Sequence, residues 1–254
     1  MKVLAIIPAR YASTRFPGKP LALLGGKSVI EGVYTQVSQA IEDVVVATDD
    51  ERIFDAVVAF GGRAVMTAMT HTSGTDRCYE AYTKVAAENG EYDIVINVQG
   101  DEPFISQDQI KSLISCFERG DRVDIATLVK PFEASDGVET LENPNSPKVV
   151  VDSQMCAIYF SRSVIPYLRG VDRNEWLTKH IFYKHIGMYG FRAEALSSVT
   201  SLPCSSLEIA ESLEQLRWIE NGYKIGVGVT DIQTIGIDTP EDLEAAEIFL
   251  ANKK

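Results

Sequence analysis

The sequence is short of basic residues. It has 24 Lys and Arg against 36 Asp and Glu, which gives 254 residues a formal net charge of −12. Proteins that bind nucleic acid generally present a basic face to the phosphates, so this composition disfavours general nucleic-acid binding. If the protein binds an anion, a local group of basic side chains must meet it.

Cysteine is also scarce, and the four cysteines (Cys78, Cys116, Cys156, Cys204) lie far apart without a CxxC pair. This spacing argues against a zinc site and a disulfide framework, and favours free thiols in a reducing cytoplasm. No stretch reaches the length of a membrane span, and the apolar run in MKVLAIIPAR is too short for a signal peptide. We therefore expect a cytoplasmic protein that does not bind membranes, long enough to bury its own core.

Short apolar runs alternate with helical patterns in the first half of the chain. Strands are expected at 3–9, 44–48, 63–67 and 93–98, and helices at 28–40, 50–60 and 75–88. This alternation implies right-handed crossovers and a mostly parallel sheet with helices on its faces. The sequence therefore predicts an α/β, Rossmann-like fold.

The second half is less regular. After a helix at 106–117, strands are expected at 124–130, 147–152 and 155–162, with a hairpin turn at 152–154. The stretch 166–183 is interpreted as a surface excursion that keeps its aromatic residues.

Two helices are predicted near the C-terminus. One covers 205–222, with a capping box of Ser205 and Glu208, closure by Gly222, and an apolar stripe of Ile209, Leu213 and Leu216. The other follows a short strand within 234–250, with Thr239 as N-cap and Pro240 at the first helical position.

Basic residues are concentrated directly after the first strand. In IIPARYASTRFPGKP, Arg10, Arg15 and Lys19 precede the first acidic residue of the chain, Glu31. Open α/β sheets bind ligands at the carboxyl ends of their strands, where cations and backbone amides can hold a triphosphate. The loop has neither the GxxxxGK[ST] nor the GxGxxG pattern. The alternative is a solvated basic loop, but the acid-free run favours an anion site.

Two carboxylates follow apolar runs in similar positions. Asp101 lies in NVQGDEPF and Asp238 in IGIDTPEDL. Mg²⁺ takes one or two protein carboxylates and completes its coordination with water and phosphate oxygens. Alternatively, each aspartate serves only a turn or a helix cap. Because Thr239 is the expected cap, Asp238 remains available for a metal.

Two further motifs carry polar groups. HTSGTDR (71–77) could read a base edge, or its Ser73 or Thr75 could simply cap the following helix. In YKHIGMYGFR, alternation places Tyr183, His185, Gly187 and Tyr189 on one face, which is polar enough for a polyhydroxylated ligand. A buried, hydrogen-bonded histidine is the alternative there. Glu214 and Gln215 are expected on an exposed helix surface.

The order of these blocks resembles the 3-deoxy-manno-octulosonate cytidylyltransferase family. The resemblance runs through IIPARYASTRFPGKP, VATDDER, HTSGTDR, NVQGDEPFI, ENPNSPKVV, YFSRS, YKHIGMYGFR, LEQLR and GIDTPEDLE. The sequence departs from the family around VDRNEWLTKHIFY and at Pro147, outside the motifs that carry the chemistry.

The resemblance implies one nucleotide-diphosphosugar transferase domain over 1–254, with a β-rich extension within roughly 124–190 that forms a homodimer. It also implies that CTP and the sugar acid Kdo give CMP-Kdo and pyrophosphate, for lipopolysaccharide biosynthesis, with Mg²⁺ as cofactor. The alternatives are a CMP synthetase for amino-substituted Kdo or sialic acid, and a nucleotide sensor without catalysis.

The resemblance also assigns residues. Those near the nucleotide would be Ala9, Arg10, Ser13, Lys19, Ser73, Gly74, Arg77 and Gln99. Those contacting the sugar acid would be Arg15, Arg162, His185, Tyr189, Glu214 and Gln215. Asp101 and Asp238 would hold Mg²⁺, and the catalytic group would be Arg10, Lys19, Asp101 and Asp238.

Overall fold

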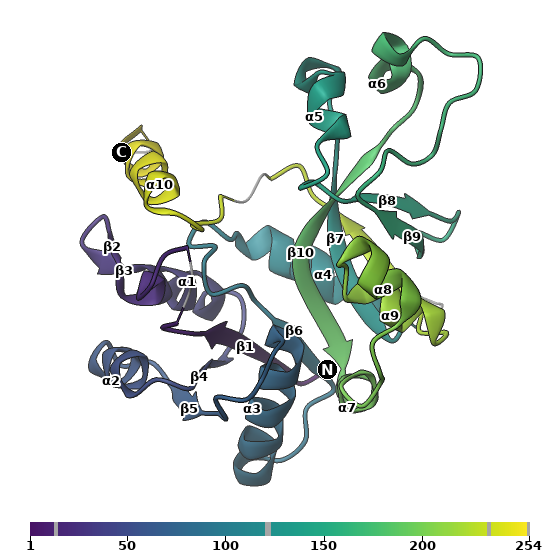
Figure 1. Ribbon diagram of the computed structural model, residues 1–254. Coiled ribbons are helices and arrows are strands. Elements are labelled where there is room, and N and C mark those ends of the chain that lie inside the picture. The colour runs from purple at the N-terminus through teal and green to yellow at the C-terminus, as the bar shows by residue number, and fades with distance from the viewer. Residues whose placement is uncertain (13–14, 120–122, 233–234, 253–254) are drawn as a thin grey trace. The chain divides into compact units, whose positions relative to one another are not determined.

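The computed structural model describes residues 1–12, 15–119, 123–232 and 235–252 (Figure 1). The chain divides into two compact units. The first comprises Met1–Ile110, Phe191–Thr200 and Thr234–Lys254, and the second comprises Lys111–Gly190 and Ser201–Gln233. That these units form one domain over 1–254, with a β-rich extension within roughly 124–190, stays a prediction.

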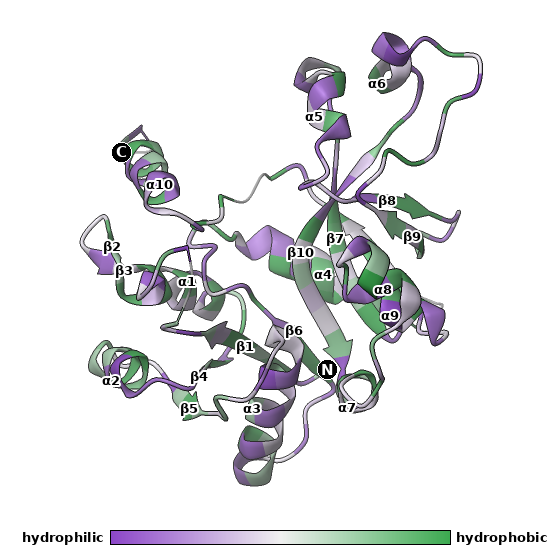
Figure 2. Ribbon diagram, viewed as in Figure 1, coloured by the Kyte–Doolittle hydropathy of each residue, from purple (hydrophilic) through white to green (hydrophobic). Residues whose placement is uncertain are grey.

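A parallel sheet forms the centre of the first unit. Its strands are ordered β6 (Ile94–Asn97), β1 (Val3–Ala9), β4 (Asp43–Thr48) and β5 (Ala64–Met66). All four lie where the sequence predicts them, within one or two residues. The three longer strands are almost wholly buried, as expected of parallel strands, and β1 is strongly hydrophobic in Figure 2.

The helices of the first unit follow the strands in alternation. Three of them begin at side-chain caps: Ser28 for α1 (Val29–Ser38), Asp50 for α2 (Glu51–Ala59) and Ser73 for α3 (Gly74–Asn89). The predicted alternation of parallel strands and helices is confirmed. The remaining elements are the hairpin β2 (Leu23–Leu24) and β3 (Lys27–Ser28), the 3₁₀ turn η1 (Lys19–Leu21), and the helices α7 (Ala193–Val199) and α10 (Pro240–Asn252).

The second unit mixes parallel and antiparallel strands. β7 (Ile125–Pro131) lies between β10 (Tyr183–Arg192) and β11 (Ile225–Val229), and pairs in parallel with β11. β8 (Lys148–Val151) and β9 (Ala157–Ser161) form the predicted hairpin, and β8 also pairs antiparallel with β10. The sequence analysis did not identify β11 or the β2–β3 hairpin.

Short helices connect the strands of the second unit. After α4 (Gln107–Ser115) come η2 (Cys116–Glu118), η3 (Ala134–Asp136), α5 (Val138–Glu142), η4 (Arg173–Glu175) and α6 (Trp176–Lys179). The predicted excursion at 166–183 builds a small core of its own. Trp176 and Phe182 are buried there with Phe132 and Leu141, which explains the aromatic residues along this irregular stretch.

The single helix predicted at 205–222 is wrong. The chain forms α8 (Ser206–Glu211) and α9 (Gln215–Glu220), separated by Ser212 in the left-handed conformation with φ 50°. The Arg162 guanidinium binds the carbonyls of Glu211 (2.6 Å) and Ser212 (3.2 Å), which an unbroken helix would have used itself. The capping box of Ser205 and Glu208 is confirmed, but Ile209 is 70% exposed and outside the predicted stripe.

The short strand predicted before the last helix is also wrong. Residues 235–238 are irregular, because Ile237 donates its backbone N–H to the Asp101 carbonyl at 2.9 Å instead of joining a sheet. The helix α10 and its cap are confirmed. Asp242 N–H donates to Thr239 Oγ1 at 3.2 Å, and the Asp242 carboxylate accepts from the Thr239 amide at 2.9 Å.

Candidate functional site

The basic loop after β1 lines an open cavity in the first unit. Gly18 has φ 73° and donates its N–H to the Tyr11 carbonyl at 2.9 Å, which turns the chain back so that Lys19 begins η1. The cavity has a volume of about 370 Å³. Its lining residues are Pro8, Ala9, Arg10, Ala12, Arg15, Lys19, Pro20, Gln99, Gly100, Asp101 and Asp238.

Lys19 joins the two predicted metal ligands within this cavity. Its Nζ lies 2.7 Å from Asp101 Oδ2 and 3.1 Å from Asp238 Oδ1. Arg15 Nη2 lies 3.2 Å from the same Asp238 oxygen. The Lys19 side chain is 13% exposed and that of Asp238 46% exposed, so water and ligand can reach the carboxylates. Residues distant in sequence therefore form one cluster of alternating charge.

Local backbone geometry explains how the two carboxylates converge. A Cβ on Gly100 would lie 2.6 Å from the Pro8 carbonyl oxygen, so the turn after β6 can approach β1 only with glycine there. The bond from Ile237 to the Asp101 carbonyl then ties the segment before α10 to this turn. Because Thr239 and Asp242 cap the helix, the Asp238 side chain faces the cavity, as the sequence predicts.

The donor set suits Mg²⁺. Oxygens of Asp101 and Asp238 converge on one cation, the Lys19 ammonium, and so could converge on a metal ion. Among the residues that the structure describes, no three His, Cys, Asp or Glu side chains gather to hold a metal. Two carboxylates suffice for Mg²⁺ only if water and phosphate oxygens supply the other positions. The geometry therefore fits a metal that arrives with a phosphate ligand.

Arg10 reaches across the cavity edge to the loop before α3. Its Nη2 donates to the carbonyls of His71 at 2.6 Å and Ser73 at 3.4 Å. Burial lowers the pKa of Arg10, and the neighbouring Arg77 lowers it further. Ser73 Oγ accepts from the Asp76 amide at 3.0 Å, so the expected capping role is present.

Arg77 lies in the interior and not in the cavity. Its side chain is fully buried, and it donates to Asp49 Oδ2 at 2.7 Å and Thr67 Oγ1 at 2.5 Å. These bonds give Arg77 a structural role beneath the loop before α3, and direct contact with a ligand stays a prediction. Gly74 begins α3, next to Asn97 and Pro8. Ser13, another predicted nucleotide contact, lies outside the described residues.

The predicted sugar residues of the second unit gather around β10. The rings of His185 and Tyr189 lie 5.4 Å apart, and Tyr189 packs edge-on against Trp218 at 5.0 Å. The alternating faces are as predicted, since Ile186 and Met188 are buried on the opposite side. His185 Nε2 lies 3.0 Å from Thr127 Oγ1, which is the hydrogen-bonded histidine considered as an alternative.

The polar residues of α8 and α9 flank this aromatic group. Glu211 accepts from Ser161 Oγ at 2.7 Å and from the Arg162 amide at 2.9 Å, while Arg217 donates to Glu214 at 2.7 Å. Burial, together with the charge of Glu214, raises the pKa of Tyr189.

Gln215 corrects the expectation of an exposed helix surface. It is only 4% exposed, and its Nε2 is buried without a hydrogen-bond partner in the structure. An amide in this position is suited to a ligand that completes its bonding.

Comparison with known proteins identifies the family. A cytidylyltransferase family model matches residues 4–225. A 3-deoxy-manno-octulosonate cytidylyltransferase of Phocaeicola vulgatus is 61% identical over 254 residues, covering 100% of this chain and 99% of the relative. The chain belongs to the 3-deoxy-manno-octulosonate cytidylyltransferase family. The resemblance of the sequence blocks is thereby confirmed.

Other relatives agree with this family. The 3-deoxy-manno-octulosonate cytidylyltransferase of Bacteroides thetaiotaomicron is 60% identical and that of Thermodesulfovibrio yellowstonii 48% identical, over at least 97% of both chains. A solved structure of CMP:2-keto-3-deoxy-manno-octonic acid synthetase complexed with CTP matches all of both chains with a TM-score of 0.90 and 40% identity. The predicted α/β nucleotidyltransferase fold is confirmed.

Three polar residues that bond to Arg77 or to the loop before α3 were missed in the sequence: Asp49, Thr67 and Glu80. Asp49 follows β4 directly, so the rule that selected Asp101 and Asp238 could also have selected it. Thr67 and Glu80 carried no such signal, although the spacing of Glu80 and Lys84 suits a pair on one helix face.

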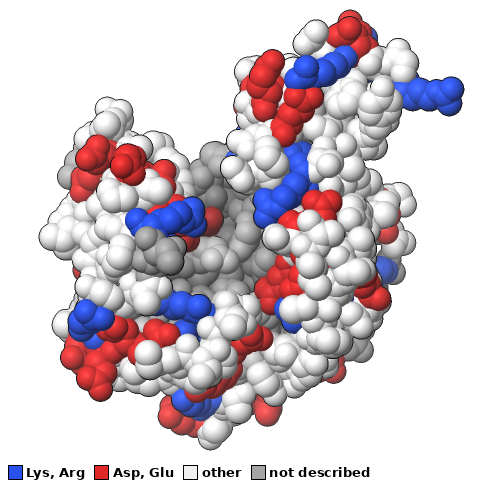
Figure 3. Space-filling view, viewed as in Figure 1, with Lys and Arg blue, Asp and Glu red and all other residues white. Residues whose placement is uncertain are grey.

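On the face shown in Figure 3, basic side chains lie singly or in small groups beside acidic ones.

His185 is expected to make the cytidylyltransferase less stable in mild acid. Burial lowers its pKa from 6.5 to about 4. The unfolded chain binds the His185 proton more readily than the folded chain does. The contribution of neutral His185 to the free energy of unfolding is therefore complete above pH 6.5 and is lost as the pH falls from 6.5 through 4. The loss should approach about 3 kcal/mol. Urea unfolding between pH 7.5 and 4.5 would measure it.

The variant His185→Gln should flatten this dependence between pH 6.5 and 4. The matched control is His180→Gln, because His180 is exposed. The control should show the same dependence of the unfolding free energy on pH as the unaltered protein. An unchanged dependence in His185→Gln would contradict the attribution of the acid sensitivity to His185.

Proposed function

We propose that this chain transfers the cytidylyl group of CTP to the anomeric hydroxyl of Kdo, giving CMP-Kdo and pyrophosphate. The position of Lys19 is the main support for this proposal. Its ammonium group lies in the cavity between the carboxylates of Asp101 and Asp238, which could together bind a metal ion that also binds phosphate. Relatives named for this reaction over their full length support the same conclusion. The proposed product serves lipopolysaccharide biosynthesis.

The reaction joins two anions, and the chain concentrates its cations accordingly. The anomeric oxygen attacks the α-phosphorus in line, and the bond from that phosphorus to the bridging oxygen of pyrophosphate breaks. The hydroxyl proton leaves to solvent. Arg10 and Lys19 then stabilise the charge that grows on the departing pyrophosphate, as fixed cations do in phosphoryl transfer.

Asp101 and Asp238 would hold Mg²⁺, with phosphate and water as its other ligands. Bound Mg²⁺ supplies Lewis acidity, which lowers the pKa of a coordinated hydroxyl and balances phosphate charge. Lys19 and Arg15 balance the charge of these carboxylates. When CTP arrives, these cations can turn to the phosphates and to the carboxylate of the sugar acid.

Several residues of the second unit are proposed to contact the sugar acid. His185, Tyr189 and Gln215 present polar atoms that suit hydroxyl groups, and burial keeps His185 neutral at neutral pH. Arg162 currently binds the carbonyls of Pro144, Glu211 and Ser212. Its proposed part in binding the sugar therefore includes shaping the loop after α8. A homodimer in the cytoplasm also belongs to this proposal.

Pyrophosphate release tests the function directly. With Mg²⁺, release should require both CTP and Kdo and should be much slower with UTP or ATP. Amino-substituted Kdo and sialic acid, tested in turn, separate the related sugar-acid synthetases. CTP binding without release in the presence of any of these sugar acids would instead indicate a nucleotide sensor.

A further inference from the structure

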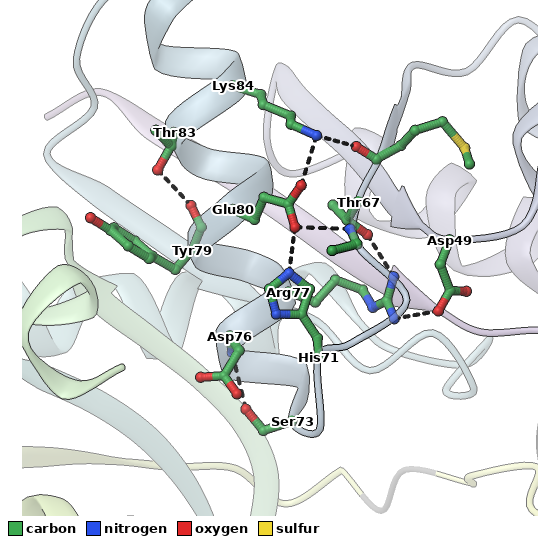
Figure 4. A network of polar contacts seen from close by, with 12 residues as sticks. Asp49, Thr67, His71, Ser73, Asp76, Arg77, Tyr79, Glu80, Thr83 and Lys84 are labelled. Carbon is green, nitrogen blue, oxygen red and sulfur yellow. Dashed lines mark hydrogen bonds and ion pairs between the residues drawn. The ribbon is translucent and has the colours of Figure 1, made fainter. Parts of the chain in front are cut away.

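Glu80 is the centre of a polar network beside the loop that joins β5 to α3 (Figure 4). Its carboxylate accepts from the Ala68 amide at 2.9 Å and pairs with Lys84 Nζ at 2.7 Å. The same oxygen that meets Ala68 also hydrogen-bonds the His71 ring. Figure 4 shows the carboxylate between Lys84 on one side and His71 on the other. Glu80 thus holds two points of the loop that joins β5 to α3.

The charge on Glu80 is retained across the physiological pH range. Burial alone would raise its pKa, but hydrogen bonds from Lys84, the Ala68 amide and His71 outweigh burial and lower it to about 2. The carboxylate is therefore ionised whenever the protein works. An ionised acceptor makes stronger hydrogen bonds than a neutral one, which suits a fixed anchor.

The anchored loop ends on Arg10. The His71 carbonyl accepts from Arg10 Nη2 at 2.6 Å, which is the shorter of the two bonds that this nitrogen makes to the loop. Arg10 itself lines the cavity that holds Lys19 and both carboxylates. A continuous chain of contacts therefore runs from Glu80 through His71 to a cation of the active site.

We propose that Glu80 is a positioning residue: through His71 it sets where the Arg10 guanidinium meets the triphosphate of CTP. This inference rests on the proposed function, because it takes the cavity ligand to be CTP. Glu80 does not line the cavity, so its effect reaches the substrate only through the loop. Displacing a cation by about 1 Å can cost up to a hundredfold in rate.

Comparison of two ligands separates positioning from general support. CMP keeps the base, the ribose and one phosphate of CTP, but lacks the two phosphates that would meet Arg10. If Glu80 only stabilised the fold, its loss would weaken the binding of both ligands alike. If it positions Arg10, its loss should weaken the binding of CTP and leave that of CMP unchanged.

The experiment is calorimetric titration of the full chain with CTP and with CMP, in the presence of Mg²⁺. Glu80→Gln should raise the dissociation constant of CTP about tenfold, as expected for a lost charged hydrogen bond, and change that of CMP less than twofold. The matched control is Glu88→Gln, since Glu88 is on the same helix and pairs with Arg63 at an exposed site. The control should bind both ligands as the unaltered protein does.

A double-mutant cycle tests the route through Arg10. In an Arg10→Met background, Glu80→Gln should change CTP affinity less than twofold, because the group it positions is gone. His71→Gln provides a second route if Glu80→Gln folds poorly, and it should show the same selective loss for CTP. Equal losses for CTP and CMP, unchanged CTP affinity, or additive effects in the cycle would overturn the proposal.

The same titrations separate this inference from the proposed function. Unaltered protein that binds CTP but releases no pyrophosphate with Kdo would contradict the function alone. Normal release by the unaltered protein, with CTP affinity unchanged in Glu80→Gln, would contradict the positioning role alone.

Discussion

Asp238→Asn is expected to lower kcat about a thousandfold, which corresponds to about 4 kcal/mol of lost transition-state stabilisation. The asparagine keeps the size of the side chain and the capping of α10 by Thr239 and Asp242. It removes one of the two charges that converge at Lys19. Steady-state pyrophosphate release at saturating CTP, Kdo and Mg²⁺ measures the change.

Glu241→Gln is the matched control for this variant. Glu241 lies in the first turn of the same helix and is exposed. It does not line the cavity, so its turnover should stay within twofold of the unaltered protein. Near-normal turnover of Asp238→Asn at saturating Mg²⁺ would contradict a metal shared by Asp101 and Asp238.

Gly100→Ala is expected to cost both stability and activity. The added Cβ would lie 2.6 Å from the Pro8 carbonyl oxygen, and backbone in a buried strand cannot easily yield. We expect a loss of about 2–3 kcal/mol in the free energy of unfolding. Because Asp101 follows directly, kcat should fall about a hundredfold as its carboxylate is displaced. Urea unfolding and pyrophosphate release would be measured on the same preparation.

A second glycine near the site serves as the control. Gly236 lies two residues before Asp238, and a Cβ there would meet nothing within 4 Å. Gly236→Ala should therefore keep its stability within about 0.5 kcal/mol. If the two variants behaved alike, the close approach of the Gly100 turn to β1 would not be what places Asp101.

The parallel sheet of the first unit was predictable because its signals are local. Apolar runs of strand length, separated by capped amphipathic segments, specify β1, β4, β5 and β6 within one or two residues. β11 was missed because its sequence, IGVGV, has alternate glycines and few side chains to show a pattern. The break between α8 and α9 was missed because the carbonyl acceptors there are bound by Arg162, about 50 residues earlier in the sequence.

The candidate site likewise contains residues that the sequence could indicate and residues that it could not. Arg10 and Asp101 could be selected because each follows a predicted strand, and the strand ends of a parallel sheet share one edge. Lys19 could be selected from the acid-free basic loop, and Asp238 from the apolar run before it, although that run does not form a strand. Arg77 could not be placed, since nothing in HTSGTDR tells a buried ion pair with Asp49 from an exposed cation. Gln215 was expected on the surface, because a helix pattern alone does not show what packs over it.

The sequence by itself determined the α/β class, the strands of the first sheet, the family and the group of charges after β1. Those features depend on local propensity, on the order of motifs and on composition, which a linear chain displays directly. Only the tertiary structure decided that Lys19 lies between Asp101 and Asp238, and that Glu80 reaches Arg10 through His71. Such contacts join residues up to 219 positions apart, and long-range packing alone fixes their distances.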